Sequence, residues 1–169
     1  MNNPTTYYYE SGQIKSEYYF QNNQYHRDND QPAVIWYSQN GQIQKEYWYQ
    51  NDQLHREDGQ PTVIHYYQSG KAEGEHYYQN SQYHRENDQP AIIFYYKSGK
   101  TKRESYLQND QHHRNNDQPA IICYYKSGNV ESEYYYQNNQ HHRENGPASI
   151  DYEEKQWIIN ISNTMNQEI

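Results

Sequence analysis

The sequence predicts an all-β protein, in the form of an elongated repeat array of stacked antiparallel β-hairpins that make one open, twisted sheet. Three observations predict this class. The 169-residue chain repeats itself with a period of 29 residues, which is typical of repeat architectures. Each period holds two short β-branched and aromatic segments around a turn. The chain has 23 tyrosines, and only 32% of its residues are hydrophobic, so a thin sheet suits it better than a thick core.

The period is visible in residues of one type that recur every 29 positions. Among them are Gly12, Gly41, Gly70, Gly99 and Gly128, Glu17, Glu46, Glu75, Glu104 and Glu133, and Pro32, Pro61, Pro90 and Pro119. We therefore expect residues 1–152 to form five hairpin units and the first strand of a partial sixth. Residues 153–169 are expected to be a C-terminal cap, with a turn at Glu153 to Gln156, a return strand at Trp157 to Ile161 and a tail.

Two strands and a turn make up each unit. "PAVIWY" (Pro32 to Tyr37) predicts the first strand, and "QIQKEYWY" (Gln42 to Tyr49) predicts the second. Proline is tolerated at the first residue of a strand, where its missing N–H costs little. The dipeptide Asn40-Gly41 between the strands favours a two-residue hairpin turn with positive φ.

The second strand alternates between two faces. In the first unit Ile14, Tyr18 and Phe20 share one face, whereas Glu17 and Tyr19 share the other. We expect the face of Ile14 and Tyr18 to be the buried one.

A third short segment, "QNNQYHR", follows the second strand and predicts a tight turn at Asn22-Asn23. With these two residues at the centre of the turn, the cross-strand pairs would be Tyr19 with His26, Tyr18 with Arg27 and Glu17 with Asp28. Three full strands per unit would reverse the direction of successive copies, so we expect a short flap beside two long strands. Equivalent residues would then recur about every 10 Å, twice the inter-strand spacing. The alternative is a parallel β-solenoid with copies about 5 Å apart.

The stretches "YYESGQIKSEYYFQN" and "HREDGQPTVIHYYQSG" resemble the divergent MORN-type repeats (membrane occupation and recognition nexus) with His-Arg-x-x-Gly-Pro-Ala linkers, as found in bacteria and large DNA viruses. The resemblance covers about residues 7 to 152. It implies stacked hairpins in an extended sheet that serves mainly as a scaffold for protein contacts, and in some members a contact with lipid head groups. Gly59 and Gly146 keep the linker glycine, which Asp30, Asp88 and Asp117 replace.

The linker "HRDNDQPA" and its copies supply the candidate binding residues. These are His26, Arg27, His55, Arg56, His84, Arg85, His113, Arg114, His142 and Arg143. Recurring about every 10 Å, they could form a strip for repeated anionic groups or a long partner. The alternative is structural: each arginine but Arg114 is followed directly by an acidic residue, as in Arg27-Asp28, and these residues or the Glu17 series would neutralise the arginines. In that interpretation each histidine would hydrogen-bond the neighbouring aromatic residue of the Tyr19 series.

One position of the first strand varies while its neighbours do not. It holds Trp36, His65, Phe94 and Cys123 in successive units. A position of this kind could be read by a partner without disturbing the fold, so Trp36, His65 and Phe94 join the candidate binding residues.

Several function classes are disfavoured. A formal charge of −8 argues against general binding of nucleic acid. Ladder copies about 10 Å apart cannot converge on one metal ion. An active site needs one asymmetric pocket, yet no unit departs from the pattern to supply a nucleophile or a phosphate-binding glycine loop. We therefore expect neither an enzyme, a metal site nor a cofactor.

The predicted function is a non-enzymatic repeat scaffold whose partner is another protein or a second copy of the chain. One alternative is binding of a polyanionic, lipid head-group or glycan surface through the His-Arg ladder. Another is a structural component of a viral or cellular assembly. The N-terminal "MNNPTTYYYE" has no basic region followed by an apolar run, so we expect no secretion signal and a cytoplasmic location, or the virion if the protein is viral.

The nine histidines predict a response to pH. Protonation of all nine would change the formal charge from −8 to +1 between neutral and mildly acidic solution. We expect solubility and partner binding to differ between about pH 5.5 and pH 7.5, as measured by light scattering or by a binding assay. Identical scattering at the two values would contradict this expectation.

Overall fold

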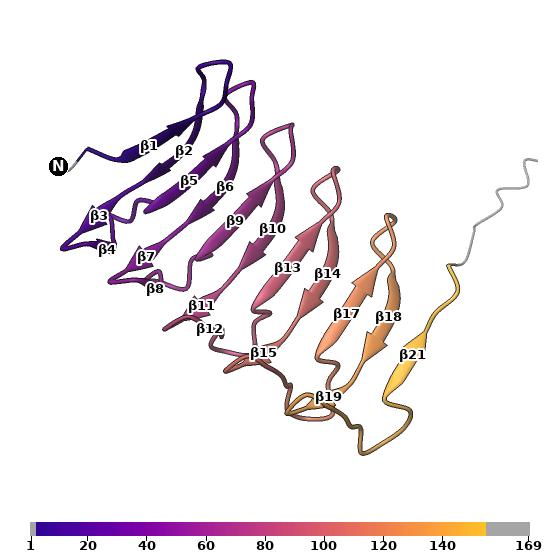
Figure 1. Cartoon of the computed structure of the whole chain (residues 1–169). Coiled ribbons are helices and arrows are strands. Elements are labelled where there is room, and N and C mark those ends of the chain that lie inside the picture. The colour runs from indigo at the N-terminus through magenta and orange to yellow at the C-terminus, as the bar shows by residue number, and fades with distance from the viewer. Residues whose placement is uncertain (1–2, 155–169) are drawn as a thin grey trace, which may run out of the picture.

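A computed structural model describes residues 3–154, and these residues form strands and turns with no helix long and apolar enough to span a membrane. Eleven strands make one antiparallel sheet in the order β1-β2-β5-β6-β9-β10-β13-β14-β17-β18-β21 (Figure 1). The strands are β1 (Thr5–Tyr8), β2 (Ile14–Tyr18), β5 (Val34–Tyr37), β6 (Ile43–Tyr47), β9 (Val63–Tyr66), β10 (Ala72–His76), β13 (Ile92–Tyr95), β14 (Thr101–Ser105), β17 (Ile121–Tyr124), β18 (Val130–Tyr134) and β21 (Ser149–Asp151). The predicted open array of stacked hairpins is confirmed, and the parallel solenoid is wrong.

A separate two-stranded hairpin follows the second strand of each unit. These flaps are β3 (Phe20–Gln21) with β4 (Gln24–Tyr25), β7 (Tyr49–Gln50) with β8 (Gln53–Leu54), β11 (Tyr78–Gln79) with β12 (Gln82–Tyr83), β15 (Leu107–Gln108) with β16 (Gln111–His112), and β19 (Tyr136–Gln137) with β20 (Gln140–His141). Only two strands per unit therefore enter the main sheet. Because two is an even number, the first strand of every unit runs in the same direction in this antiparallel sheet.

The flap turn has the predicted geometry. Asn22 and Asn23 both have positive φ, 51° and 62°, as a type I′ turn requires. Phe20 pairs with Tyr25, and the His26 amide donates to the Tyr19 carbonyl at 3.2 Å. Beyond that bond the predicted pairing is wrong: β2 pairs instead with β5, the first strand of the next unit.

The main hairpin turn differs from the predicted two-residue form. The Gly41 amide donates to the Ser38 carbonyl at 2.9 Å, and the Ser38 amide donates to the Gln42 carbonyl at 2.8 Å. Gly41 has a φ of 82°, whereas Asn40 is not among the residues with positive φ. The loop thus has three residues, a type I turn followed by a left-handed glycine. This is the other common hairpin solution for a sequence of this kind.

A β-bulge beside this turn changes which face each residue occupies. Trp36 pairs with Lys45 but Tyr37 pairs with Ile43, so one residue, Gln44, is extra. Paired residues share a face of the sheet, and a one-residue slip in the pairing exchanges the two faces. Ile43 therefore lies on the same face as Tyr37, and Lys45 lies on the other face with Trp36. Ile43 is 38% exposed, as is its equivalent in the first unit, Ile14. The expectation that this isoleucine series lies on the buried face is wrong.

The most covered aromatic series is the one expected on the exposed face. The Tyr19 series supplies Trp48, Tyr77, Tyr106 and Tyr135, each between 4% and 8% exposed. Four residues that directly follow the linker prolines, Ala33, Thr62, Ala91 and Ala120, are fully buried. The core is therefore a thin layer where the linkers fold back onto the sheet, since within residues 3–154 no second large sheet packs on the first.

The capping prediction falls largely outside the described residues. β21 supplies the predicted first strand of the sixth unit and pairs with β18. The proposed return strand, Trp157 to Ile161, lies outside residues 3–154.

Replacing Gly41 by alanine tests the three-residue turn. An alanine there meets no atom within 4 Å, so its cost is the left-handed φ alone, and we expect Gly41→Ala to lower the free energy of unfolding by about 1 kcal/mol. Urea denaturation measures this change. Gln39→Ala, at an exposed position of the same turn, should change stability by less than about 0.5 kcal/mol. Equal effects of the two substitutions would refute the assigned turn.

Candidate functional site

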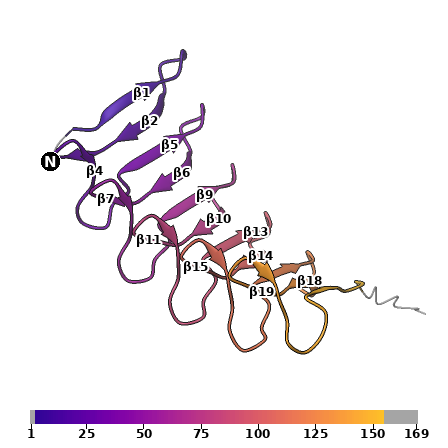
Figure 2. The same cartoon turned by 60° about the horizontal axis from the view of Figure 1, so that its bottom comes forward.

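The linkers between flap and next hairpin form a row along one edge of the array (Figure 2). In the first unit β4 ends at Tyr25, and His26 and Arg27 follow directly. A second left-handed pair, Asn29 and Asp30, with φ of 62° and 50°, then turns the chain back toward β5. Asparagine and aspartate tolerate this conformation better than most residues. The linker is therefore ordered by its own turn residues.

Every linker arginine lies over an aromatic ring of its own unit. The guanidinium carbon is 3.6–3.9 Å from the ring centroid, in the pairs Arg27 with Tyr19, Arg56 with Trp48, Arg85 with Tyr77, Arg114 with Tyr106 and Arg143 with Tyr135. Nη1 of each arginine donates to the carbonyl of the linker proline at 3.0–3.3 Å. Stacking and hydrogen bonding together fix the guanidinium plane.

Three of the arginines also bind an aspartate of the preceding linker. Arg56 Nε and Nη2 donate to the two oxygens of Asp30, both at 2.7 Å. Arg114 binds Asp88 in the same two-pronged way at 3.0 Å. Arg143 Nε lies 3.6 Å from Asp117 Oδ2. The hydrogen bond from Arg56 lowers the pKa of Asp30 below its ordinary value. These pairs join each linker to the next.

The structure changes the assignment of the acidic residues that follow the linker arginines in the first three units. Asp28 Oδ1 lies 3.1 Å from Nε2 of His26, and Glu57 and Glu86 make the same contact with the histidines two residues before them, at 3.2 and 3.0 Å. The interpretation that these acids neutralise the arginines is wrong, because alternate residues of an extended segment lie on the same side. The predicted hydrogen bond from each linker histidine to the Tyr19 series is not made by the imidazole ring. The backbone amide of the histidine instead donates to the backbone carbonyl of that aromatic residue, as His26 does to Tyr19.

The Glu17 series, the other predicted arginine partner, binds tyrosine instead. Tyr37 donates its hydroxyl to Glu17 at 2.7 Å, and the equivalent bonds link Tyr66 with Glu46, Tyr95 with Glu75, Tyr124 with Glu104 and Tyr152 with Glu133 at 2.5–2.9 Å. Glu75 also accepts from the hydroxyl of Tyr77 at 3.0 Å. Burial, and then the negative Glu75, raise the pKa of Tyr77 to about 12.

The varied position of the first strand lies apart from the linker row. Residues of this position pair directly with the strands on either side, as Trp36 does with Ser16 and Lys45. The Phe94 ring lies where a side chain on Gly74 would stand, 3.0 Å from the ideal Cβ. His65, Phe94 and His76 form one ring cluster, with centroids 5.2 and 5.6 Å from His76. The size of the side chain at the varied position is thus matched by the residue on the neighbouring strand, as Phe94 is by Gly74.

Burial of histidine rings also changes the expected proton count. Desolvation lowers the pKa of His76 to about 4, and it also lowers the pKa values of His65 and His112. With a pKa of about 4, the His76 ring stays largely neutral in mildly acidic solution, so a charge of +1 there is an overestimate.

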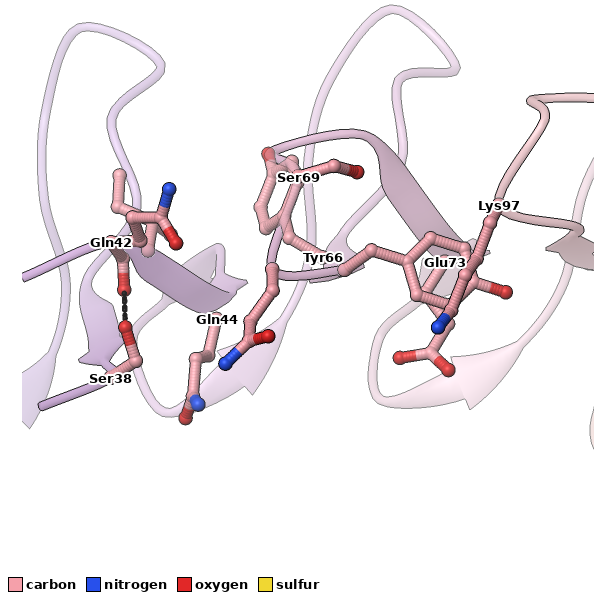
Figure 3. Close-up of a pocket in the computed structure, with 10 residues that line it drawn as sticks. Ser38, Gln42, Gln44, Tyr66, Ser69, Glu73 and Lys97 are labelled. Carbon is pink, nitrogen blue, oxygen red and sulfur yellow. Dashed lines mark hydrogen bonds between the residues drawn. The ribbon is translucent and has the colours of Figure 1, made fainter. Parts of the chain in front are cut away.

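Three open pockets lie along the linker row. The first, of about 360 Å³, is beside Arg27; the next, of about 240 Å³, lies between the first and second linkers; and the third, of about 590 Å³, lies between the second and third linkers. A separate pocket of about 420 Å³ near the hairpin turns is lined by polar side chains such as Gln44, Glu73 and Lys97 (Figure 3). Within residues 3–154 no three His, Cys, Asp or Glu side chains gather as metal ligands would.

Sequence reasoning identified every histidine and arginine of the row but missed the aspartates that bind the arginines. Their signal was present, since Asp30, Asp88 and Asp117 stand where the linker of the resembled family has glycine. Because each partner arginine lies 26 residues further on, the pairing becomes visible only when both linkers are folded.

The sequence model of the MORN repeat variant matches residues 1–22 and 121–138. The two stretches contain the first hairpin, β1 and β2, and the fifth, β17 and β18, and the match confirms the resemblance to MORN-type repeats. Repeats of this kind are generally associated with binding of proteins or membranes. No curated protein is significantly similar to the chain in sequence.

Replacing His76 by tyrosine, the residue of the same position in three other units, tests the buried ring. Because the folded-state pKa of about 4 lies below the ordinary 6.5, the unfolded chain takes up the proton first. We expect the free energy of unfolding to fall by about 2 kcal/mol as the pH drops from 6.5 to 4. His76→Tyr should remove this part of the fall. His141→Tyr, at an exposed ring, should retain it. Urea denaturation across this range measures both, and parallel curves for His76→Tyr and the wild type would contradict the assignment.

Proposed function

We propose that this MORN-like array is a non-enzymatic scaffold that binds a protein partner along its linker row. The observation that carries the proposal is the series of open pockets along the first three linkers, with charged side chains of both signs on their rims. A row of this kind offers an extended partner contacts in successive units. The aromatic rings beneath the arginines give the row a rigid floor.

The charge of the row favours a protein over a membrane or another polyanion. Asp30, Asp88 and Asp117 neutralise three of the five arginines, and the exposed carboxylates Asp28, Glu57 and Glu86 stand beside the histidines. A polyanion would meet these carboxylates at nearly every unit. A protein surface with charges of both signs can complement such a row.

The arrangement of polar groups also favours binding over catalysis. Tyrosine, glutamate and histidine are repeated in each unit and bonded to one another, as in the Tyr37–Glu17 and His26–Asp28 contacts. Acid-base catalysis would need one of these groups to be free of its partner and to lie in a single enclosed pocket. The tyrosine–glutamate bonds instead hold neighbouring strands together, and the histidine–carboxylate contacts lie within one linker.

The test has a binding arm and a membrane arm. The immobilised full chain captures partners from an extract of its source cells, and each captured protein is then purified and titrated directly. In parallel, the chain is sedimented with vesicles of phosphatidylserine in phosphatidylcholine. We expect saturable binding of a purified protein and no sedimentation with vesicles. Sedimentation with vesicles, without direct binding of any purified protein, would overturn the proposal.

Two double charge-reversal variants test whether the partner contacts the linker row. Glu57→Arg with Glu86→Arg alters two exposed linker carboxylates and should weaken binding of the purified partner about tenfold or more. Glu73→Arg with Glu131→Arg makes the same charge change on exposed residues of β10 and β18, away from the linkers, and should leave affinity nearly unchanged. Equal weakening by the two double variants would place the contact elsewhere.

A further inference from the structure

One junction of the linker row lacks the ion pair that the other inter-linker junctions form. Arg56, Arg114 and Arg143 bind aspartates of the preceding linker. The equivalent position before Arg85 is Gly59. Within residues 3–154, Arg85 forms no ion pair and its Nε and Nη2 atoms have no hydrogen-bond acceptor, although the next residue back, Asp58, carries a carboxylate.

Arg85 is nevertheless held in the same geometry as the paired arginines. Its guanidinium carbon lies 3.6 Å from the centroid of the Tyr77 ring, and Nη1 donates to the Pro90 carbonyl at 3.3 Å. Arg56 makes the same two contacts and presents Nε and Nη2 to Asp30. The edge of Arg85 that would bind a carboxylate is therefore already oriented, which lowers the entropic cost of binding one.

Space for that carboxylate is open at this junction. The pocket between the second and third linkers has a volume of about 590 Å³ and is lined by Gly59, Tyr77 and Arg85, whereas the pocket at the paired junction before it measures about 240 Å³. A Cβ on Gly59 would meet no atom within 4 Å.

The other charged groups of the pocket are mostly engaged. Arg56 is bound to Asp30, and Glu57 and Glu86 contact His55 and His84. Asp58 is exposed and lowers the attraction for a highly charged anion. Arg27 also lacks an aspartate partner among the described residues, but its pocket is walled by the first linker alone. A single carboxylate entering between two linkers thus fits the Arg85 junction best.

We propose that Arg85 is the anchoring residue for an aspartate or glutamate side chain of the partner protein, which takes the place that Asp30 and Asp88 occupy at other junctions. The inference rests on the proposed binding along the linker row. It gives that row one specific contact point, in the third unit, where the array's own carboxylate is missing.

The variant Gly59→Asp fills the site from within. Asp30, Asp88 and Asp117 adopt φ of 50–54°, close to the 65° of Gly59, so an aspartate is tolerated there. Gly59→Asn is the matched control, with the same size and no charge. We expect Gly59→Asp to raise Tm relative to Gly59→Asn, because it completes the ion pair with Arg85.

Binding is followed by NMR through the Nε–H signal of Arg85. The probe is the blocked tripeptide glycyl-glutamyl-glycine, its glutamine counterpart is the neutral control, and inorganic phosphate is the alternative anion. We expect the glutamyl peptide to shift the Arg85 signal, and to bind the Gly59→Asp variant about tenfold more weakly than Gly59→Asn. Arg56, already paired, should not respond.

Three results would overturn the inference: equal affinity of the two Gly59 variants for the glutamyl peptide, equal shifts with the glutamine peptide, or tighter binding of phosphate than of the peptide. The peptide titration needs no partner, so it stands if the proposed function fails. Conversely, if a purified partner binds wild type and Gly59→Asp equally well, the scaffold function stands and the Arg85 anchor is wrong.

Discussion

Each unit of the array satisfies its polar groups mainly against the unit beside it, and this nearest-neighbour constraint governs the rest of the structure. Tyr37 reaches back 20 residues to Glu17 in the neighbouring strand. The Asp52 side chain caps the Tyr25 amide of the preceding flap at 2.7 Å, and Arg56 reaches back 26 residues to Asp30. Since no second large sheet covers the first in the described part of the chain, these contacts replace the aliphatic core that the composition cannot supply.

The same constraint makes each junction between units a separate position, at which one substitution has a local effect. Aspartate in one linker closes its junction by binding the next arginine, whereas Gly59 leaves its junction open. Phe94 and Gly74 adjust to each other across one strand pair in the same way. A repeat chain can therefore carry one specialised position without altering the spacing of the whole array, because the neighbouring junctions keep their own ion pairs and backbone ladder.

Most of the fold could be predicted from the sequence, because the 29-residue period and the need for an even number of sheet strands per unit restrict how units can stack. The Asn22-Asn23 turn followed from its residue types. The turn at Gly41 did not, since asparagine followed by glycine suits both a two-residue turn and a type I turn with a left-handed glycine. The bulge at Gln44 leaves no mark in the alternation until the partner strand is placed. For the candidate site, the arginines were identified by recurrence, but their aspartate partners depend on the folded linker.

The direction of the strands has a mechanical consequence. Hydrogen bonds of an antiparallel ladder run perpendicular to the strands, and therefore along the row of eleven strands from β1 to β21. Tension applied between the two ends of the array loads the outermost strand pair in an unzipping geometry, in which bonds break one after another. We therefore expect the array to yield hairpin by hairpin under load and to lengthen in steps of one unit.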